Sequence, residues 1–257
     1  PHDPRTPTPA FEKMYKPSQI PLPENFLAQH PFDNGEMKVR DEALLPWPRT
    51  PQAIRKERSD YYAIITHLDA QIGRILDTLD REGLTKDHLV FFAGDNGLAV
   101  GQHGLLGKQN LYDHSIRVPL IVAGPGVPAN QRTETMVYLF DIFPTLCDAA
   151  GLPQPAGLDG ESLWPVLTGT RTQWPDRKPL VWIFPEYGGQ VAVRRGEVVV
   201  GHRGKEVVEG VVADGEGEEE ERQRVAAAQA VEHAPEDLPE RQHQQHAGRH
   251  PGGHKRH

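Results

Sequence analysis

The sequence predicts an α/β fold, because two runs of strand length follow a long segment of helical periodicity. The two apolar runs, 89–93 and 119–123, each stop at a glycine-rich turn. Both are apolar on both faces, which is typical of strands that helices cover on either side of a parallel sheet. The preceding segment, 51–83, repeats apolar residues at helical spacing. We therefore expect two neighbouring, buried, parallel strands with this helix packed across them.

The residues that flank the long helix predict where it begins and ends. Thr50 offers a capping hydroxyl, and Pro51 suits the first helical position. Gly83 is a natural stop after the last turn. One face of this helix should be buried, and its stripe consists of Tyr62, Ile65, Leu68, Ile72, Ile75, Leu76 and Leu79.

Shorter elements are predicted after the second strand. A helix over 141–149 has Asp141 as its N-cap and ends at Gly151. A shorter helix follows over 162–167. The apolar run 179–184 is a further strand candidate.

The composition excludes several classes of protein. A net charge of −8 over 257 residues gives no reason to expect a nucleic-acid partner. No apolar run approaches the roughly 18 residues that a membrane span needs. Cys147 is the single cysteine, so an intrachain disulfide and a cysteine-rich zinc site are excluded. We expect this thiol to act as a small buried hydrophobic group.

The two ends of the chain differ from its middle. Residues 1–50 are rich in proline, yet their aromatic and apolar side chains predict an ordered loop docked on the domain. After Arg195 the chain contains no Ser, Thr, Asn, Ile or Phe, and an acidic run occupies 216–221. Either this tail is disordered, since little apolar surface offsets its chain entropy, or the reading frame shifts shortly after residue 196. The valines at 198–200 could form a short strand, although disorder is the simpler interpretation of this tail.

The first strand ends at two residues that could hold a metal ion. Ligands of α/β sheets bind beyond the carboxyl ends of strands, and Asp95 and Asn96 stand at such an end. Carboxylate and amide oxygens are hard ligands, of the kind Ca²⁺ or Mg²⁺ prefers. His103, Lys108 and His114 follow in the same connection. A cation beside a lysine suits a sulfate or phosphate ester, whereas the alternative is that Asp-Asn-Gly is a plain turn.

The whole string, not the triplet, resembles a known family. The sulfatase family of the alkaline-phosphatase-like superfamily has S/G-D-N/H-G after a core strand, then G-x-H-G, a lysine and R/H-V-P-L-I. Here the matching strings are G-D-N-G at 94–97, G-x-H-G at 101–104, G-K at 107–108 and H-S-x-R-V-P-L-I at 114–121. The resemblance runs from residue 1 to about residue 195 and includes P-H-D-P at 1–4 and L-D-G-x-S-L at 158–163.

This resemblance implies an alkaline-phosphatase-like sheet sandwiched by helices, present in part. Residues 1–178 would be the C-terminal part of the catalytic domain, and 179–195 the start of a small C-terminal α+β subdomain. Residues 196–257 would be the disordered or frameshifted tail. Sulfatases carry a formylglycine within C/S-x-P-x-R, and no position here fits that motif. The resemblance therefore implies that the motif precedes residue 1 and that the isolated chain is inactive.

The resemblance also implies roles for individual residues. Asp95 and Asn96 match half of the family's Ca²⁺ (or Mg²⁺) ligands. Lys108 matches the lysine that contacts the sulfate and the leaving-group oxygen, and His2 matches a sulfate-binding histidine, although a terminal histidine can also be simply exposed. His103 either helps to bind substrate or has a structural hydrogen-bonding role. The substrate would be a sulfated small molecule or carbohydrate.

Two other functions remain open at this point. One is a phosphoesterase or phosphonate hydrolase of the same superfamily, although Asn96 disfavours the members that use two zinc ions. The other is a non-catalytic remnant or binding protein. A periplasmic or secreted location would suit the full-length sulfatase, and the sequence leaves compartment and oligomeric state open.

Overall fold

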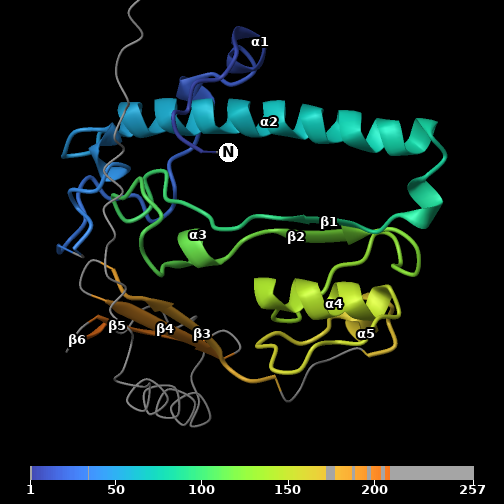
Figure 1. The fold of residues 1–257 in the computed structure, drawn as a ribbon. Helices are drawn as coiled ribbons and strands as arrows, with labels where there is room; N and C mark the ends of the chain where they lie inside the picture. Colours follow the sequence, from blue (N-terminus) through green and yellow to red (C-terminus); the bar gives the residue numbers. More distant parts are fainter. Residues whose placement is uncertain are drawn as a thin grey trace, which may run out of the picture.

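The computed structural model describes residues 2–33, 35–171, 177–186, 189–195, 198–203 and 206–208. Helices dominate the first half of this part, and antiparallel strands dominate its end (Figure 1). The elements, in chain order, are α1 (Pro9–Glu12), η1 (Pro17–Gln19), η2 (Glu42–Leu44), α2 (Pro51–Arg81), η3 (Thr85–Asp87), β1 (Val90–Ala93), α3 (Asp113–Ile116), β2 (Leu120–Ala123), η4 (Leu139–Asp141), α4 (Ile142–Ala149), α5 (Trp164–Leu167), β3 (Leu180–Phe184), β4 (Gln190–Arg195), β5 (Val198–Arg203) and β6 (Glu206–Val208).

The long helix α2 begins and ends as its flanking residues predict. The Thr50 hydroxyl accepts a hydrogen bond from the Ala53 amide at 3.2 Å, and Pro51 is the first helical residue. Gly83 follows the helix with φ of 69°, a conformation that side chains rarely adopt. The N-terminal half is buried around Ile54.

The proline-rich segment 1–50 docks on α2, which confirms that prediction. Phe11 stacks on His67 with ring centroids 4.8 Å apart, and the Tyr15 and Thr66 hydroxyls share a 2.6 Å hydrogen bond. Ile20 is buried. Aromatic anchors thus order a stretch that has little regular structure of its own.

Strands β1 and β2 are neighbours, as predicted, but they run antiparallel. Val90 pairs with Ala123 and Ala93 with Leu120, and the long segment 94–119 connects the two strands. The prediction of parallel strands was wrong because an apolar run reports burial and not direction. Parallel neighbours need a crossover connection, and this one folds back on itself without a long helix.

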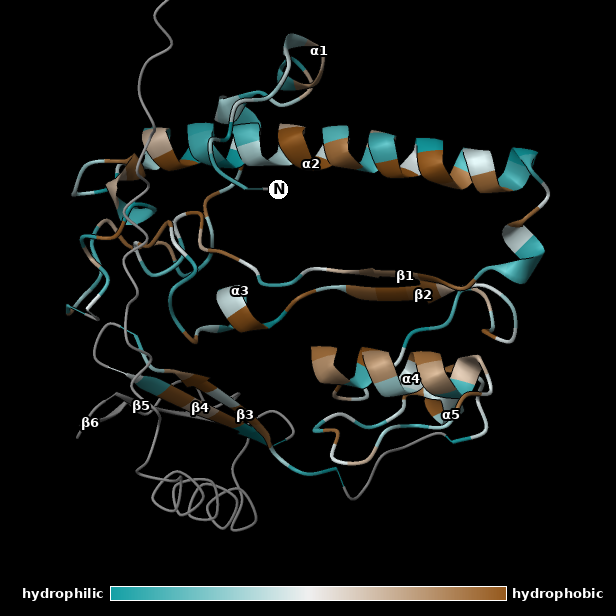
Figure 2. Cartoon of the chain, viewed as in Figure 1, coloured by the Kyte–Doolittle hydropathy of each residue, from teal (hydrophilic) through white to brown (hydrophobic). Residues whose placement is uncertain are grey.

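The predicted burial of these strands is also wrong for the described part of the chain. Ile121 of β2 is 59% exposed, and Ile75 on the face of α2 is 63% exposed. Figure 2 shows apolar residues along β1, β2 and the second half of α2. The sequence carries the apolar pattern of covered layers, while β1 and β2 are only partly covered, with side chains of intermediate or high exposure.

The C-terminal part agrees with its predicted elements and extends beyond them. Helix α4 and strand β3 lie where expected, and Gly151 follows α4 with φ of 65°. Cys147 is buried in α4, as predicted. Strands β3, β4, β5 and β6 form one antiparallel sheet in that order. The sheet therefore continues past residue 195, where a disordered or frameshifted tail was expected to start.

The chain after residue 195 gives two further outcomes. The valines at 198–200 lie in β5, so the alternative of a short strand holds there and not the simpler interpretation of disorder. Residues 209–257, with the acidic run, lie outside the described residues. A search of the described helices found none with the length and hydropathy of a membrane span.

Candidate active site

Segment 94–119, between β1 and β2, carries most of the predicted site residues. Its ends are joined by a hydrogen bond from the Gly94 amide to the Pro119 carbonyl at 3.3 Å. Further in, the Gly97 amide donates to the Ser115 carbonyl at 2.8 Å. A Cβ at Gly97 would lie 2.1 Å from the carbonyl oxygen of His114, so this close approach requires glycine. The glycines that read as turn signals thus allow the segment to fold on itself.

This folded segment lines one side of an open cleft of about 2470 Å³. Four predicted site residues line the cleft together, namely Asp95, Asn96, His103 and Lys108. The opposite side is formed by residues of β3 and β4 and by the segment that precedes η4. Sequence spacing alone placed these four residues on one connection, and the structure places them on one surface.

Asp95 and Asn96 are available as oxygen ligands. Asp95 is exposed, and its Oδ1 accepts the Asn96 amide at 2.9 Å. The Asn96 Nδ2 donates to the Gly97 carbonyl at 2.8 Å. Their oxygens are of the kind that Ca²⁺ or Mg²⁺ takes, but Ca²⁺ needs six to eight ligands. Within the described ranges no three His, Cys, Asp or Glu side chains converge to hold a metal. The oxygens of Asp95 and Asn96 are therefore suitable ligands for Ca²⁺ or Mg²⁺, but they supply only part of the number that such an ion needs.

Lys108 contributes a positive charge to the cleft. It is half-buried, and its backbone amide donates to Oε1 of Gln109 at 3.1 Å. No acidic side chain among the described residues pairs with its ammonium group. A cation without a partner at the wall of a cleft is suited to hold an anion.

His103 is tightly held by its neighbours. Its Nε2 accepts from Nδ2 of Asn25 at 3.0 Å, and its carbonyl accepts from Nδ1 of His30 at 2.9 Å. The ring stacks on Tyr112 with centroids 4.4 Å apart. Burial, with His30 nearby, lowers the pKa of His103, so the ring is neutral at pH 7. These contacts favour the structural alternative, with Nδ1–H as the one donor left for a ligand.

Two other histidines pack beside this ring. Burial lowers the pKa of His30, and burial together with His103 and His30 lowers the pKa of His114 to about 3. All three imidazoles are therefore uncharged at neutral pH. His30 was not predicted, because it lies in the proline-rich segment with no motif around it.

His2 lies apart from the other four predicted residues. It is exposed, its Nδ1 donates to the Asp3 carbonyl at 3.1 Å, and it does not line the cleft. Its neighbour Arg5 is nearly buried, pairs with Glu57 at 3.0 Å and donates to the Leu106 carbonyl at 3.1 Å. The N-terminal motif is thus anchored near the lysine loop, without His2 itself reaching the cleft.

Sequence reasoning also missed a buried ion pair beside Lys108. Glu42 and Arg49, both in the proline-rich segment, contact each other at 2.7 Å and reach the loop that ends at Lys108. The amides that Glu42 accepts lie 64 and 65 positions further along the chain, so no local pattern predicts them.

Comparison with known families gives two matches to the chain. The model described as "Sulfatase" matches residues 1–152, which is more than half of the sequence. The model "N-sulphoglucosamine sulphohydrolase, C-terminal" matches residues 101–208. The second match continues past residue 195 to the end of β6.

Individual proteins give the same result. Arylsulfatase K of Gallus gallus is 35% identical over 182 residues, which are 70% of this chain and 34% of that protein. Choline-sulfatase of Rhizobium meliloti (strain 1021) is 31% identical over 211 residues, 77% of this chain and 39% of that protein. The chain therefore spans between a third and two fifths of these relatives' length.

Solved structures share the fold. A protein in complex with its substrate D-glucosamine-2-N,6-O-disulfate superposes with a TM-score of 0.71 at 19% identity, over 90% of this chain and 62% of that one. The phosphonate monoester hydrolase of Agrobacterium radiobacter gives a TM-score of 0.65 at 26% identity, over 79% and 46%. The match of the "Sulfatase" model over residues 1–152 shows that the chain belongs to the sulfatase family.

Proposed function

We propose that the cleft is part of a site that hydrolyses sulfuric esters. The observation that carries this proposal is the ammonium group of Lys108, which pairs with no acidic side chain of the described residues and shares a cleft with Asp95 and Asn96. A sulfate ester is anionic, and its leaving oxygen gains charge as the S–O bond breaks. Fixed cations beside that bond stabilise the transition state electrostatically.

Each residue then has a defined task. Lys108 binds the sulfate and holds its positive charge near the leaving oxygen. Asp95 and Asn96 would hold a Ca²⁺ or Mg²⁺ ion, which would polarise the sulfate oxygens. His103, neutral and fixed by Asn25, shapes the pocket and offers Nδ1–H as a donor. We assign His2 to the sulfate group as well, which requires it to approach the cleft.

These residues bind and orient an ester, but they supply no nucleophile. In the sulfatases that the sequence resembles, a formylglycine hydrate within C/S-x-P-x-R attacks sulfur, and the 257-residue sequence has no such motif. We therefore propose that activity belongs to a protein of the relatives' length and that this chain alone does not turn over aryl or sugar sulfates. Its substrate would be a sulfated small molecule or carbohydrate.

A phosphonate or phosphate ester is the second candidate substrate. The likeness to a phosphonate monoester hydrolase at 26% identity supports it. A sulfate monoester and a phosphonate monoester are both tetrahedral at the central atom and carry one negative charge, so Lys108 and a divalent cation suit both. The Asn at position 96 still favours a single hard cation over a two-zinc site.

The test uses a protein of the relatives' length that contains this sequence, assayed with p-nitrophenyl sulfate and with a p-nitrophenyl phosphonate ester. We expect the sulfate to be the better substrate by kcat/KM. Lys108→Ala should lower kcat/KM by about 10²-fold, the size of effect seen when one transition-state donor is removed. The matched control is Lys86→Ala, since Lys86 is exposed on η3 and away from the cleft. Turnover by the 257-residue chain that Lys108→Ala abolishes would contradict the proposal for the chain alone.

A further inference from the structure

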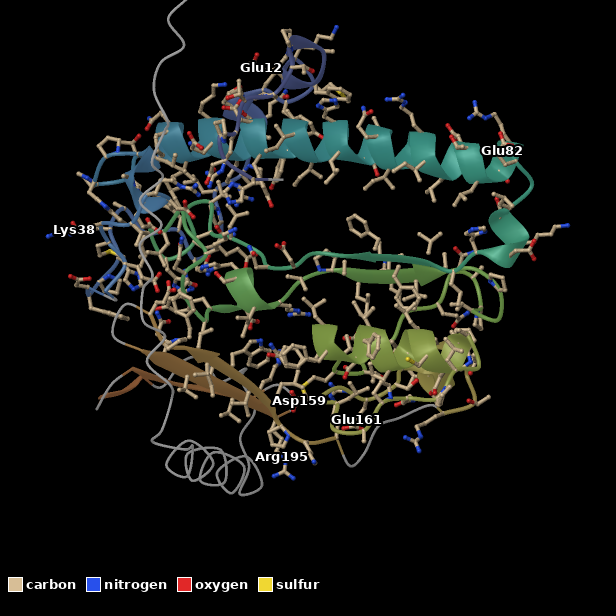
Figure 3. The ribbon with its side chains drawn as sticks, in the orientation of Figure 1. Glu12, Lys38, Glu82, Asp159, Glu161 and Arg195 are labelled. Carbon is tan, nitrogen blue, oxygen red and sulfur yellow. The ribbon has the colours of Figure 1, made fainter. Side chains whose placement is uncertain are left out.

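We propose that the buried pair of Glu42 and Arg49 positions Lys108, so that these two residues act in anion binding without touching the anion. This inference rests on the proposed function, because it takes Lys108 as the anion-binding residue. Glu42 joins segment 1–50 to segment 94–119 through the Gly107 amide. Figure 3 shows a dense group of side chains beside the start of α2, where these two segments meet. Glu42 contacts the backbone before Lys108, and Arg49 contacts Glu42.

Glu42 binds the backbone immediately before Lys108. Its Oε1 accepts the amide of Leu106 at 3.0 Å and the amide of Gly107 at 2.8 Å. The other oxygen, Oε2, lies 3.1 Å from the Leu106 amide. Glu42 is 2% exposed, so water does not compete for these bonds. Charge-assisted hydrogen bonds in such surroundings are stronger than neutral ones.

Arg49 fixes the carboxylate in turn. Its Nη2 donates to Oε2 of Glu42 at 2.7 Å and to the Glu42 carbonyl, also at 2.7 Å. A second nitrogen, Nη1, donates to the Leu45 carbonyl, and the guanidinium lies 3.7 Å from the centre of the Trp47 ring. Arg49 is 1% exposed. The planar fork therefore holds Glu42 in one orientation, which a lysine could not do.

The amide of Lys108 itself is held by a parallel chain of contacts. It donates to Oε1 of Gln109 at 3.1 Å, and Nε2 of Gln109 donates to Oδ2 of Asp41 at 3.2 Å. Three consecutive amides, from Leu106 to Lys108, are thus bound by side-chain oxygens, two of them by the same acid from segment 1–50.

Gly107 makes this close approach possible. A Cβ at that position would lie 3.0 Å from Oε1 of Glu42 and 2.8 Å from Oε1 of Gln109. The glycine before the lysine in the G-K string is therefore explained by the acid that packs on it. A backbone bound at three successive amides leaves only the lysine side chain free to move, and a functional group is held best by this kind of supporting contact.

The experiment titrates inorganic sulfate into the 257-residue chain and follows the Lys108 amide by NMR. In the unsubstituted chain we expect sulfate to shift this resonance, and Lys108→Ala should abolish binding. Glu42→Gln should weaken sulfate affinity about tenfold and speed hydrogen exchange at Leu106 and Gly107 by a similar factor, because one neutral amide cannot replace the charged acceptor. Amides in the middle of α2 should keep their protection.

The matched control is Asp141→Asn. Asp141 is also a buried acid that pairs with an arginine and accepts two backbone amides, but it lies at η4 and not beside Lys108. Hydrogen exchange at the Glu161 amide should speed up. The chemical shift of the Lys108 amide should not change, and the sulfate affinity should stay within about twofold of that of the unsubstituted chain.

Two outcomes would overturn the positioning role of Glu42 and Arg49. Both can be distinguished from the result that would refute sulfate binding at Lys108. If Glu42→Gln loses protection at Leu106 and Gly107 yet binds sulfate within twofold of the unsubstituted chain, Glu42 is structural only. If Asp141→Asn weakens sulfate binding equally, the effect is general destabilisation. Absence of sulfate binding at Lys108 in the unsubstituted chain instead refutes the proposed site, and this inference with it. Should Glu42→Gln fail to fold, Arg49→Lys, which keeps the charge but loses the fork, must weaken sulfate affinity about threefold.

Discussion

Two buried acids in this chain have almost the same surroundings and different consequences. Glu42 accepts the amides of Leu106 and Gly107 and pairs with an arginine at 2.7 Å. Asp141 accepts the amides of Tyr138 at 2.6 Å and Glu161 at 2.9 Å, and its arginine lies at 2.6 Å. The first acid binds two successive residues, whereas the second binds two separate segments.

The two acids differ in which parts of the chain carry the amides that they bind. The Asp141 arrangement joins the start of α4 to the loop through Glu161, which Figure 3 labels below that helix. The Glu42 arrangement shapes a single turn whose next residue is Lys108. A similar set of contacts therefore joins two parts of the fold in one place and, in our proposal, positions a side chain in the other. Function has to be inferred from the neighbours of a buried pair, because the pair itself does not distinguish the two cases.

Removing either acid should have the largest effect on stability. Glu42→Ala and Asp141→Ala each leave an uncompensated arginine and two amides, and we expect each to cost about 3–5 kcal/mol of the free energy of unfolding. Urea unfolding followed by circular dichroism measures both. Similar costs for the two would sharpen the comparison, and a cost below about 1 kcal/mol for either would break it.

A second prediction compares two ends of α2, where Ile54 lies near the Glu42 region and Ile75 lies far from it. Ile54 is fully buried and Ile75 is 63% exposed. Ile54→Ala should cost about 2–5 kcal/mol through the cavity it leaves. Ile75→Ala should stay within about 0.5 kcal/mol, as surface substitutions do. The same unfolding experiment reports both, and equal costs would mean that the second half of α2 is covered in solution.

The third prediction concerns how pH changes stability through His114, which packs beside His103 and Tyr112. Burial lowers the pKa of His114 to about 3, so the unfolded chain binds a proton below pH 6.5 that the folded chain does not. Stability is therefore lost as pH falls from about 6.5 towards 3. From pH 7 to pH 5 the loss from this group should be about 2 kcal/mol.

His114→Phe isolates that contribution. The aromatic ring keeps the stacking on Tyr112, whose centroid lies 5.5 Å away, but has no proton to bind. Urea unfolding at the two pH values should show a smaller loss for this variant than for the unsubstituted chain. An unchanged loss would assign the pH dependence to His30, His103 or the carboxylates.

The smallest expected effect is on metal binding by the chain itself. Calorimetric titration with Ca²⁺ should give weak binding, because only Asp95 and Asn96 supply oxygens and affinity follows the number of charged ligands. Asp95→Ala should abolish it, since the carboxylate carries a full charge, and Asn96→Ala should weaken it. Tight binding that survives Asp95→Ala would place the ion elsewhere. In an active protein of the relatives' length the same two substitutions should lower activity in the same order.

Local signals in the sequence were sufficient for some elements and not for others. Thr50 and Gly83 correctly predicted where α2 begins and ends, because helix capping depends on a few adjacent residues. The direction of β2 could not be predicted, since pairing depends on how segment 94–119 folds back. Ile121 was expected to be buried, but burial requires a covering layer, and sequence pattern reports only that the residue suits one.

The candidate site shows the same division. Asp95, His103 and Lys108 could be grouped because one connection carries them all. Asn25 and Glu42 could not, because each contacts a residue more than sixty positions away from a segment without periodicity. Tertiary contacts of this kind leave no trace in spacing, which is why the residues of segment 1–50 that contact the predicted site residues were missed.

The antiparallel pairing of β1 and β2 has a consequence for how the cleft could change through insertions. Because the Gly94 amide donates to the Pro119 carbonyl at 3.3 Å, segment 94–119 begins and ends at the same place on the two-stranded sheet. Asp95, His103 and Lys108 all lie on this one closed connection. An insertion within it would alter their spacing and leave the register of the two strands unchanged.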